Sequence, residues 1–106
     1  MTPAQGLWEQ LADELEAADE AVSRSTMMGL PCLRVDGAFF ASFDKRQEAL
    51  IVKLAATNVA ARVAEGRGRS FAPAGKVFKE WIALEDADPD EWRAALHDGR
   101  RFVQGD

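Results

Sequence analysis

The chain has 106 residues, of which 47% are hydrophobic and 29% charged, and its formal net charge is −5. These values exclude intrinsic disorder and favour one folded domain that spans residues 1–106. Cys32 is the only cysteine, so we expect neither an intrachain disulfide nor a cysteine-based zinc site. The sequence has no stretch of about 20 apolar residues and no basic N-terminus followed by an apolar run, so we expect neither a membrane span nor a signal peptide. We therefore expect a cytoplasmic location.

A helix is predicted at the beginning of the chain. In "TPAQ", Thr2 can accept a hydrogen bond from the amide of Gln5, and Pro3 suits the first helical position. Apolar residues then recur at helical spacing, with acids between them. The members of this apolar stripe are Leu7, Leu11, Leu15, Ala18 and Val22.

Three strands are predicted next, because the apolar period changes from helical to two after "SRST". "CLRVDGAFFASF" indicates two strands joined at Asp36 and Gly37, a dipeptide that tolerates the positive φ angles of a tight hairpin turn. "DKRQE" is a second polar turn, and "ALIVKL" is the third strand. Short turns between consecutive strands predict antiparallel pairing.

A second helix, a second hairpin and a third helix complete the chain. The helix fits "TNVAARVAEG", with Thr57 as its N-cap and Gly66 in the left-handed position that ends helices. "RSF" and "KVFKEWIAL" indicate a hairpin across "APAG". In "DPDEW", Asp88 caps the last helix, Pro89 is its first residue and Glu91 completes a capping box.

The predicted order is therefore helix, three strands, helix, two strands, helix. It indicates an α+β fold in which helices pack on an antiparallel sheet of about five strands. "AFFASF" and "KVFKEWIAL" are apolar on both alternations, which leaves two alternatives open. Either the helices cover both faces of the sheet, or one face meets a protein partner or a second copy of the chain.

The segments "MMGLPCLRVDGAFFASF", "LIVKL", "RSFAPAGKVFKEWIAL" and "EWRAALHDGRRFV" resemble, in order and spacing, the N-terminal domain of the TfoX/Sxy family and the related MmcQ/YjbR-like proteins. The resemblance covers nearly all of the chain after Ser25. It implies a compact α+β domain, frataxin-like in the MmcQ/YjbR relatives, with a largely uncharacterised activity. The TfoX/Sxy regulators of competence also have a C-terminal domain, which lies outside this resemblance, so we do not expect their regulatory role on the basis of the resemblance alone.

The segment "GRGRSFAPAGK" and the lysine after it suggest an anion or nucleic-acid site made by Arg67, Arg69, Lys76 and Lys79. A phosphate loop follows a strand and opens a helix, whose free amides point at the anion. Here the glycines follow a helix and precede a strand, so we interpret the segment as a corner of the chain. Contact between these cations and a nucleic-acid backbone is kept as an alternative, although no aromatic signature of an RNA-binding protein is visible.

The first helix offers a second candidate site. Glu9, Asp13, Glu16 and Glu20 are offset by four, seven and eleven residues, which places their carboxylates on one helical face. Such a ridge can hold hard cations through oxygen, and the frataxin-like resemblance makes iron the metal to name. A charged solvent face of an amphipathic helix is the simpler interpretation.

The sequence presents no catalytic constellation. His97 is the only histidine, lies beside arginines on the outer side of the last helix and has no evident carboxylate or nucleophile partner. Cys32 alternates with Arg34 on its predicted strand and is interpreted as a small apolar residue. We therefore predict no enzyme activity and no cofactor. The function that the sequence favours is that of a binding or regulatory module, with a protein partner ahead of nucleic acid and with weak iron binding as the competing alternative.

Overall fold

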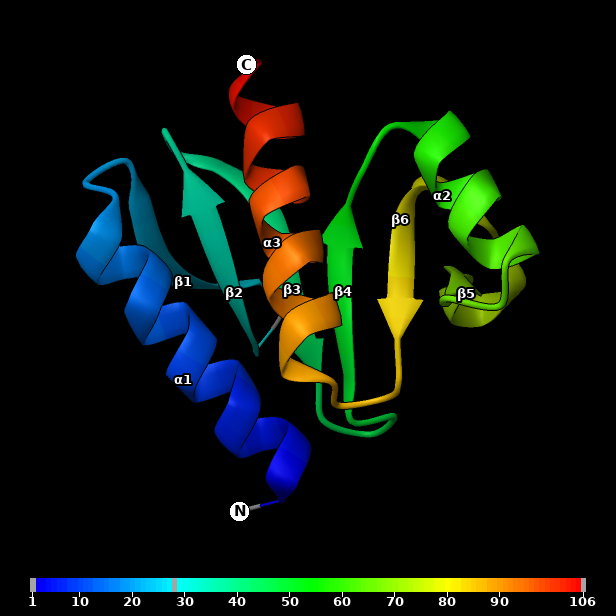
Figure 1. Cartoon of the computed structure of the whole chain (residues 1–106), viewed down its shortest axis with the longest axis horizontal. Helices are drawn as coiled ribbons and strands as arrows, with labels where there is room; N and C mark the ends of the chain where they lie inside the picture. The colour runs from blue at the N-terminus through cyan, green and yellow to red at the C-terminus, as the bar shows by residue number, and fades with distance from the viewer. Residues whose placement is uncertain (1, 28, 106) are drawn as a thin grey trace.

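The computed structural model describes residues 2–27 and 29–105, so Met28 of the motif "MMG" and the ends of the predicted domain lie outside the described residues. Figure 1 shows three helices and one sheet, which confirms the α+β class. The described helices are too short or too polar to cross a membrane. In chain order the elements are α1 (Pro3–Ala18), β1 (Val22–Met27), β2 (Leu30–Val35), β3 (Ala38–Asp44), β4 (Ala49–Lys53), α2 (Ala56–Ala64), β5 (Arg69–Phe71), a 3-10 turn (Pro73–Gly75), β6 (Phe78–Leu84) and α3 (Pro89–Gln104).

The sheet has six antiparallel strands in the order β1-β2-β3-β4-β6-β5, one more than the approximate number predicted. The additional strand is β1, which contains "SRST" and pairs with β2 from Val22 opposite Val35. Val22 therefore begins a strand, and its assignment to the helical stripe was wrong. The helix ends at Ala18, and the Asp19 carboxylate accepts the amide of Ala21 at 2.9 Å, which turns the chain before Val22. Residues 23–26 of this edge strand are all polar, so a search for apolar periods does not find it.

The predicted ends of the helices are mostly confirmed. Thr2 Oγ1 accepts the amide of Gln5 at 3.1 Å. Gly66 has φ 75°, and the amides of Gly66 and Arg67 bond back to the last turn of α2. The cap at Thr57 was wrong: Ala55 precedes α2, and its carbonyl already accepts the amide of Val59 at 3.0 Å, which places Thr57 inside the helix.

The predicted turns and the last helix also agree with the structure. Asp36 and Gly37 both have positive φ, as the tight hairpin requires. β5 and β6 pair antiparallel across the 3-10 turn. The Asp88 carboxylate accepts the amides of Asp90 and Glu91 at 2.9 and 3.2 Å. The side chain of Glu91 is engaged elsewhere, by an arginine, as described below.

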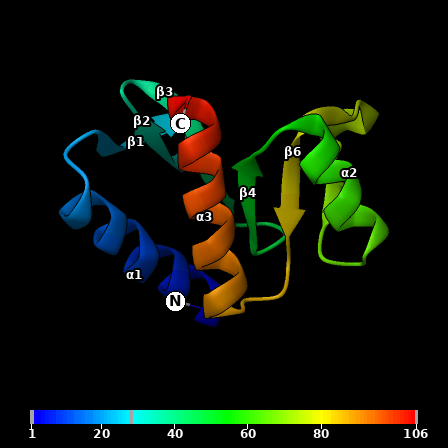
Figure 2. The same cartoon turned by 45° about the horizontal axis from the view of Figure 1, so that its top comes forward.

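All three helices pack on one face of the sheet, as Figures 1 and 2 show for α1 and α3 in front of the strands and for α2 beside β6. Their buried residues share one core with Leu33, Val35, Leu50, Val52 and Ile82 of the strands. At its centre the ring of Phe43 lies 6.1 Å from Trp8 of α1 and 6.4 Å from Trp92 of α3.

The opposite face of the sheet carries a smaller apolar cluster that contains strand residues only. Its buried members are Ala49, Ile51 and Ala83, with Phe71 and Trp81 packed partly buried against them. Within the described residues the helices therefore cover one face of the sheet only, and contact of the other face with a protein partner or a second copy stays a prediction. We call this other face the open face.

Candidate functional site

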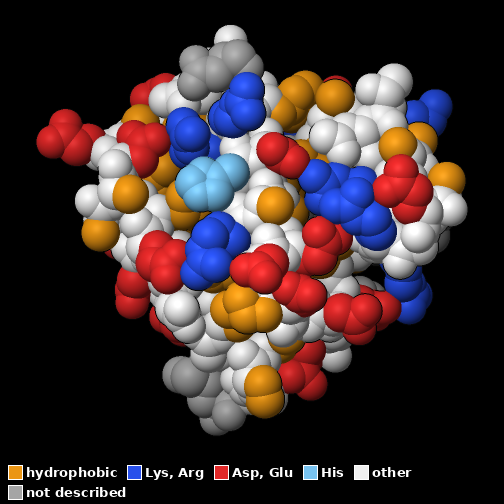
Figure 3. Space-filling view, in the orientation of Figure 1, with side chains coloured by type: hydrophobic (Ala, Val, Ile, Leu, Met, Phe, Trp, Pro, Cys, Tyr) orange, Lys and Arg blue, Asp and Glu red, His pale blue; other side chains and the backbone are white. Residues whose placement is uncertain are grey.

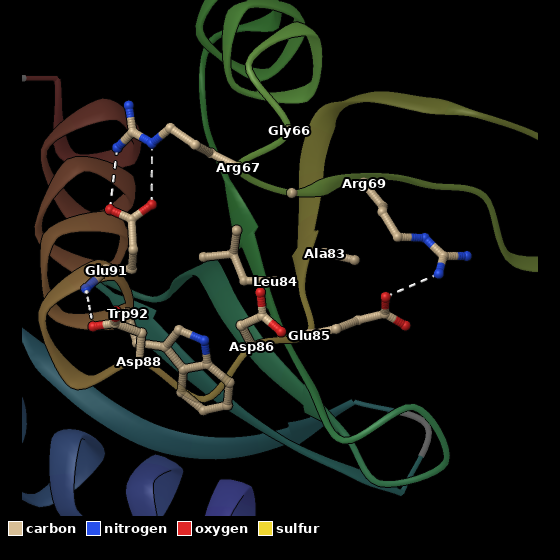
Figure 4. A pocket seen from close by; sticks show the side chains of 11 residues that line it. Gly66, Arg67, Arg69, Ala83, Leu84, Glu85, Asp86, Asp88, Glu91 and Trp92 are labelled. Atoms are coloured by element: carbon tan, nitrogen blue, oxygen red, sulfur yellow. Dashed lines mark hydrogen bonds and ion pairs between the residues drawn. The ribbon is translucent and has the colours of Figure 1, made fainter.

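The two arginines of the predicted anion site are paired with acids. Arg67 donates from Nε and Nη2 to the two carboxylate oxygens of Glu91, each at 3.1 Å, and from Nη1 to Glu65 at 3.1 Å (Figure 4). Arg69 donates to Glu85 at 2.9 Å. Both guanidinium groups thus already have anionic partners in the folded chain, and an external phosphate would have to compete with them.

A hollow of about 290 Å³ lies beside these pairs, between the end of α2, the strands β5 and β6 and the start of α3. Four carboxylates line it against two guanidiniums, so its charge is unfavourable for an anion. The amides at the start of α3 are not available either, because Asp88 accepts two of them. These contacts favour the interpretation of "GRGRSFAPAGK" as a corner. The lining residues are Gly66, Arg67, Gly68, Arg69, Ala83, Leu84, Glu85, Asp86, Asp88, Glu91 and Trp92.

The two lysines of the same predicted site lie apart from the arginines. Both Lys76 and Lys79 are exposed near the start of β6, and neither forms an ion pair within the described ranges. Lys76 Nζ lies 6.0 Å from the ring centroid of Phe78. The structure therefore does not bring the four predicted cations together as one cradle.

Three of the four acids in the predicted metal site converge on one cation. Arg24 of β1 lies within 3.2 Å of Glu9, 2.6 Å of Asp13 and 3.8 Å of Glu16. Glu20, the fourth, is exposed in the turn after α1. Residues 2–27 and 29–105 contain no group of three or more His, Cys, Asp or Glu arranged to hold a metal ion. Arg24 thus engages three of the four acids and offsets one of their charges, and iron binding stays a prediction without further support.

The face of the molecule that carries the helices is electrostatically mixed. Figure 3 views it and shows basic and acidic side chains interspersed over α1, α2 and α3. Ion pairs join the helices to one another: Arg62 to Asp98 at 2.7 Å, and Arg93 to Glu14 at 3.2 Å. This face offers no concentrated patch of one sign.

The open face has a different composition. Residues opposite one another in an antiparallel register point to the same side, so the register defines rows across the sheet. One row contains four small side chains, Ser25, Cys32, Ser42 and Ala83. Its members on β4 and β5 are Ile51 and Arg69.

The adjoining row alternates cations and aromatic rings. Arg34 of β2 is opposite Phe39 of β3, and its guanidinium carbon lies 4.4 Å from the centroid of that ring. Lys53 of β4 is opposite Trp81 of β6, and its Nζ lies 5.9 Å from the centroid of the tryptophan ring. Phe71 of β5 ends the row beside Trp81 in the small apolar cluster. We call these five partly buried residues, Arg34, Phe39, Lys53, Trp81 and Phe71, the cation–aromatic row.

The cations of this row lack carboxylate partners. Across the described residues, neither Arg34 nor Lys53 forms an ion pair, in contrast to Arg24, Arg62, Arg67 and Arg69. The buried Nε of Arg34 also has no acceptor among them. The open face therefore combines uncompensated positive charge with aromatic surface, although the whole chain is negative.

Sequence reasoning missed this row because its members come from five strands that are scattered along the chain. Each cation or ring, taken alone, is ordinary in its segment. A signal was present: the side of each strand that lacks the core residues carries Arg34, Lys53 or Trp81. Only the strand order aligns them.

The remaining reactive side chains show no pairing for catalysis. Cys32 is buried in the row of small residues, and this burial raises the pKa of its thiol above the ordinary 9.0, which disfavours the nucleophilic thiolate. His97 is exposed on α3. The prediction that the chain is not an enzyme stays a prediction.

Comparison with known proteins gives no family assignment. No protein-family model matches the chain, and a search of curated proteins finds no relative. The resemblance to the TfoX/Sxy N-terminal domain and the MmcQ/YjbR-like proteins, with its frataxin-like fold, therefore remains a prediction from the quoted motifs.

Proposed function

We propose that this protein is a non-enzymatic binding module that holds an anionic macromolecular partner on the open face of its sheet. The single observation that supports the proposal is the cation–aromatic row. Arg34 and Lys53 are held on aromatic rings without any carboxylate partner among the described residues, on the one face that the helices leave uncovered.

Energetics supports this choice of surface. A cation that already pairs with a carboxylate gains less from a second anion, since the first carboxylate has offset its charge and occupies some of its donors. A cation next to an aromatic ring, by contrast, keeps its capacity for hydrogen bonds to an incoming anion. Arg24, Arg67 and Arg69 belong to the first kind, and Arg34 and Lys53 belong to the second.

The proposal keeps the function that the sequence favours, that of a binding module. It places the binding site on the open face instead of on the hairpin at residues 66–79. The predicted hairpin cations contribute at most through Lys76 and Lys79, because Arg67 and Arg69 are paired. The TfoX/Sxy resemblance and the cytoplasmic location are part of the proposal, and the resemblance brings no known activity to the chain.

The test is a titration of the isotope-labelled protein with heparin, a generic polyanion, followed by amide chemical shifts. We expect saturable shifts in β2, β3, β4 and β6 that weaken as salt is added. The charge reversal Lys53→Glu should reduce the affinity several-fold. The matched control is Arg101→Glu, which makes the same change of charge at an exposed position on α3. Shifts confined to the helices, or equal losses in both variants, would contradict the proposal.

A further inference from the structure

We infer that the partner of the open face is single-stranded nucleic acid, whose bases stack on the aromatic members of the cation–aromatic row while its phosphates meet Arg34 and Lys53. This inference rests on the proposed function and specifies its ligand. It goes beyond the backbone contacts that the sequence suggests at residues 66–79, because it places the contacts on the sheet and gives the bases a role.

The alternation of charge and ring across the strands is the first argument. Neighbouring strands lie about 4.8 Å apart, so the row from β2 to β5 is about 19 Å long, enough for a few nucleotides of an extended strand. Proteins that bind single strands combine a basic track with aromatic platforms on which bases stack. Arg34 and Lys53 provide the track, and Phe39, Trp81 and Phe71 provide the rings.

The aromatic surface extends from the β5 end of the row along the hairpin. Phe78 of β6 is opposite Phe71, with the two rings 5.9 Å apart, and it is 40% exposed, which makes it one of the few exposed large apolar side chains. Lys76 Nζ lies 6.0 Å from the centroid of the Phe78 ring. A further aromatic–cation pair thus lies beside the row, toward the turn of the hairpin, where it widens the platform.

The position of the row on a wide sheet argues that a duplex is the poorer ligand. Bases of B-form DNA are read by an element that enters a groove, such as a helix or a two-stranded ribbon. The five residues of the row are partly buried and are spread over five strands of a six-stranded sheet. They can meet unpaired bases, whose faces are free, but they cannot reach bases inside a duplex.

Charge also argues against a second copy of the chain on this face. A symmetric dimer would place the same surface on both sides of the interface. Arg34 and Lys53 of both copies would then share one interface. Neither has an ion-pair partner among the described residues, and Asp44, which is opposite Ala49 on this face, offsets only one of the two positive charges of each copy. An acidic peptide would satisfy these cations, but it would leave the aromatic rings without a specific role.

Tryptophan fluorescence provides a direct readout of stacking. Trp8 and Trp92 are 1% and 0% exposed in the core, whereas Trp81 is partly exposed on the open face. A base that stacks on Trp81 should quench its emission, and a polyanion without bases should not. The probe is a thymidine oligomer of about 12 nucleotides, within the range of site sizes for a small single-strand-binding fold. Its matched control is the abasic oligomer of the same length, which keeps the phosphates and lacks the bases.

The experiment measures quenching and fluorescence anisotropy with the thymidine oligomer, its abasic control, a duplex of the same length, and heparin. We expect the thymidine oligomer to bind most tightly and to quench, with affinity falling as salt rises by a log–log slope of about −1.4 for two phosphate contacts on a single strand. Trp81→Leu keeps an apolar side chain on the small cluster and should weaken binding about tenfold, the usual scale for one stacked base. Phe39→Leu is the second variant, and a circular dichroism spectrum checks the fold of both.

The outcomes separate this inference from the proposed function. Equal binding of the abasic and thymidine oligomers without quenching would overturn the inference and leave an anion-binding open face. Tighter binding of the duplex would overturn it as well. Failure of every polyanion, or a dimer in sedimentation experiments that buries Trp81, would overturn both the inference and the proposed function.

Discussion

The guanidinium of Arg67 holds the carboxylate of Glu91 through two parallel hydrogen bonds, each 3.1 Å long. This pair connects the segment that leaves α2 to the first turn of α3 (Figure 4). Glu91 is thereby diverted from the capping box that the sequence predicts, and Arg67 is diverted from anion binding. One contact between residues 24 positions apart accounts for both differences.

The Arg67–Glu91 pair predicts a pH dependence of stability. Because Arg67 donates to it, the pKa of Glu91 lies below its ordinary value of 4.5. A lowered pKa in the folded state stabilises the protein above about pH 4.5, and this contribution is lost as the pH falls through the folded pKa. We therefore expect Arg67→Gln to lower the urea midpoint slightly at pH 7 and by less at pH 3. An equal loss at both pH values would show that the pair contributes through packing.

A second prediction concerns the buried cation between α2 and α3. Arg62 is 7% exposed, and its Nη2 donates to Asp98 at 2.7 Å. The change Asp98→Ala removes the carboxylate from a buried charge and should cost about 1–3 kcal/mol in the free energy of unfolding. Asp13→Ala is the comparison, because Arg24 retains Glu9 and Glu16, and it should cost no more than about 0.5 kcal/mol. Chemical denaturation of both variants measures the difference, and similar losses would contradict it.

A third prediction concerns the close approach of α3 to β4. A Cβ added at Gly99 would lie 2.5 Å from Val52 Cγ1 and 3.1 Å from the carbonyl oxygen of Lys53. Alanine favours a helix over glycine by about 1 kcal/mol, but overpacking costs about 1–3 kcal/mol. We expect Gly99→Ala to destabilise the protein on balance. The control Ala94→Gly, on the exposed side of α3, should cost about 0.5–1 kcal/mol through propensity alone. A thermal unfolding midpoint for Gly99→Ala above that of the wild type would show that α3 can move away from β4.

A fourth prediction concerns the thiol of Cys32. The side chain is 1% exposed, and burial raises its pKa, so both access and thiolate formation oppose alkylation. Iodoacetamide at pH 8 should modify the folded protein at least tenfold more slowly than the protein in denaturing urea. Mass spectrometry of timed samples measures both rates. Comparable rates would mean that β2 opens readily from its neighbours.

Local rules of sequence predicted much of the fold. Thr2 and Asp88 cap helices through hydrogen bonds that form within three residues, and Asp36-Gly37 turns the chain because of its own backbone preferences. β1 was missed because Ser23, Arg24 and Ser25 have no apolar period, and their place in the sheet depends on pairing with β2. The N-cap of α2 was misplaced because this helix begins where the chain leaves β4. That position depends on the tertiary structure and not on the residues of the helix alone.

The α+β class, the antiparallel hairpins and the boundaries of most elements follow from periodicity, capping and turn chemistry between near neighbours, so they can be predicted from the amino-acid sequence. Which charges are available to a partner depends instead on contacts between distant parts of the chain. Arg24, Arg67 and Arg69 find carboxylates on other elements, while Arg34 and Lys53 find aromatic rings on adjacent strands. The physical reason is that an ion pair acts over a few ångströms between groups far apart in the chain, so a count of charges along the sequence cannot predict it.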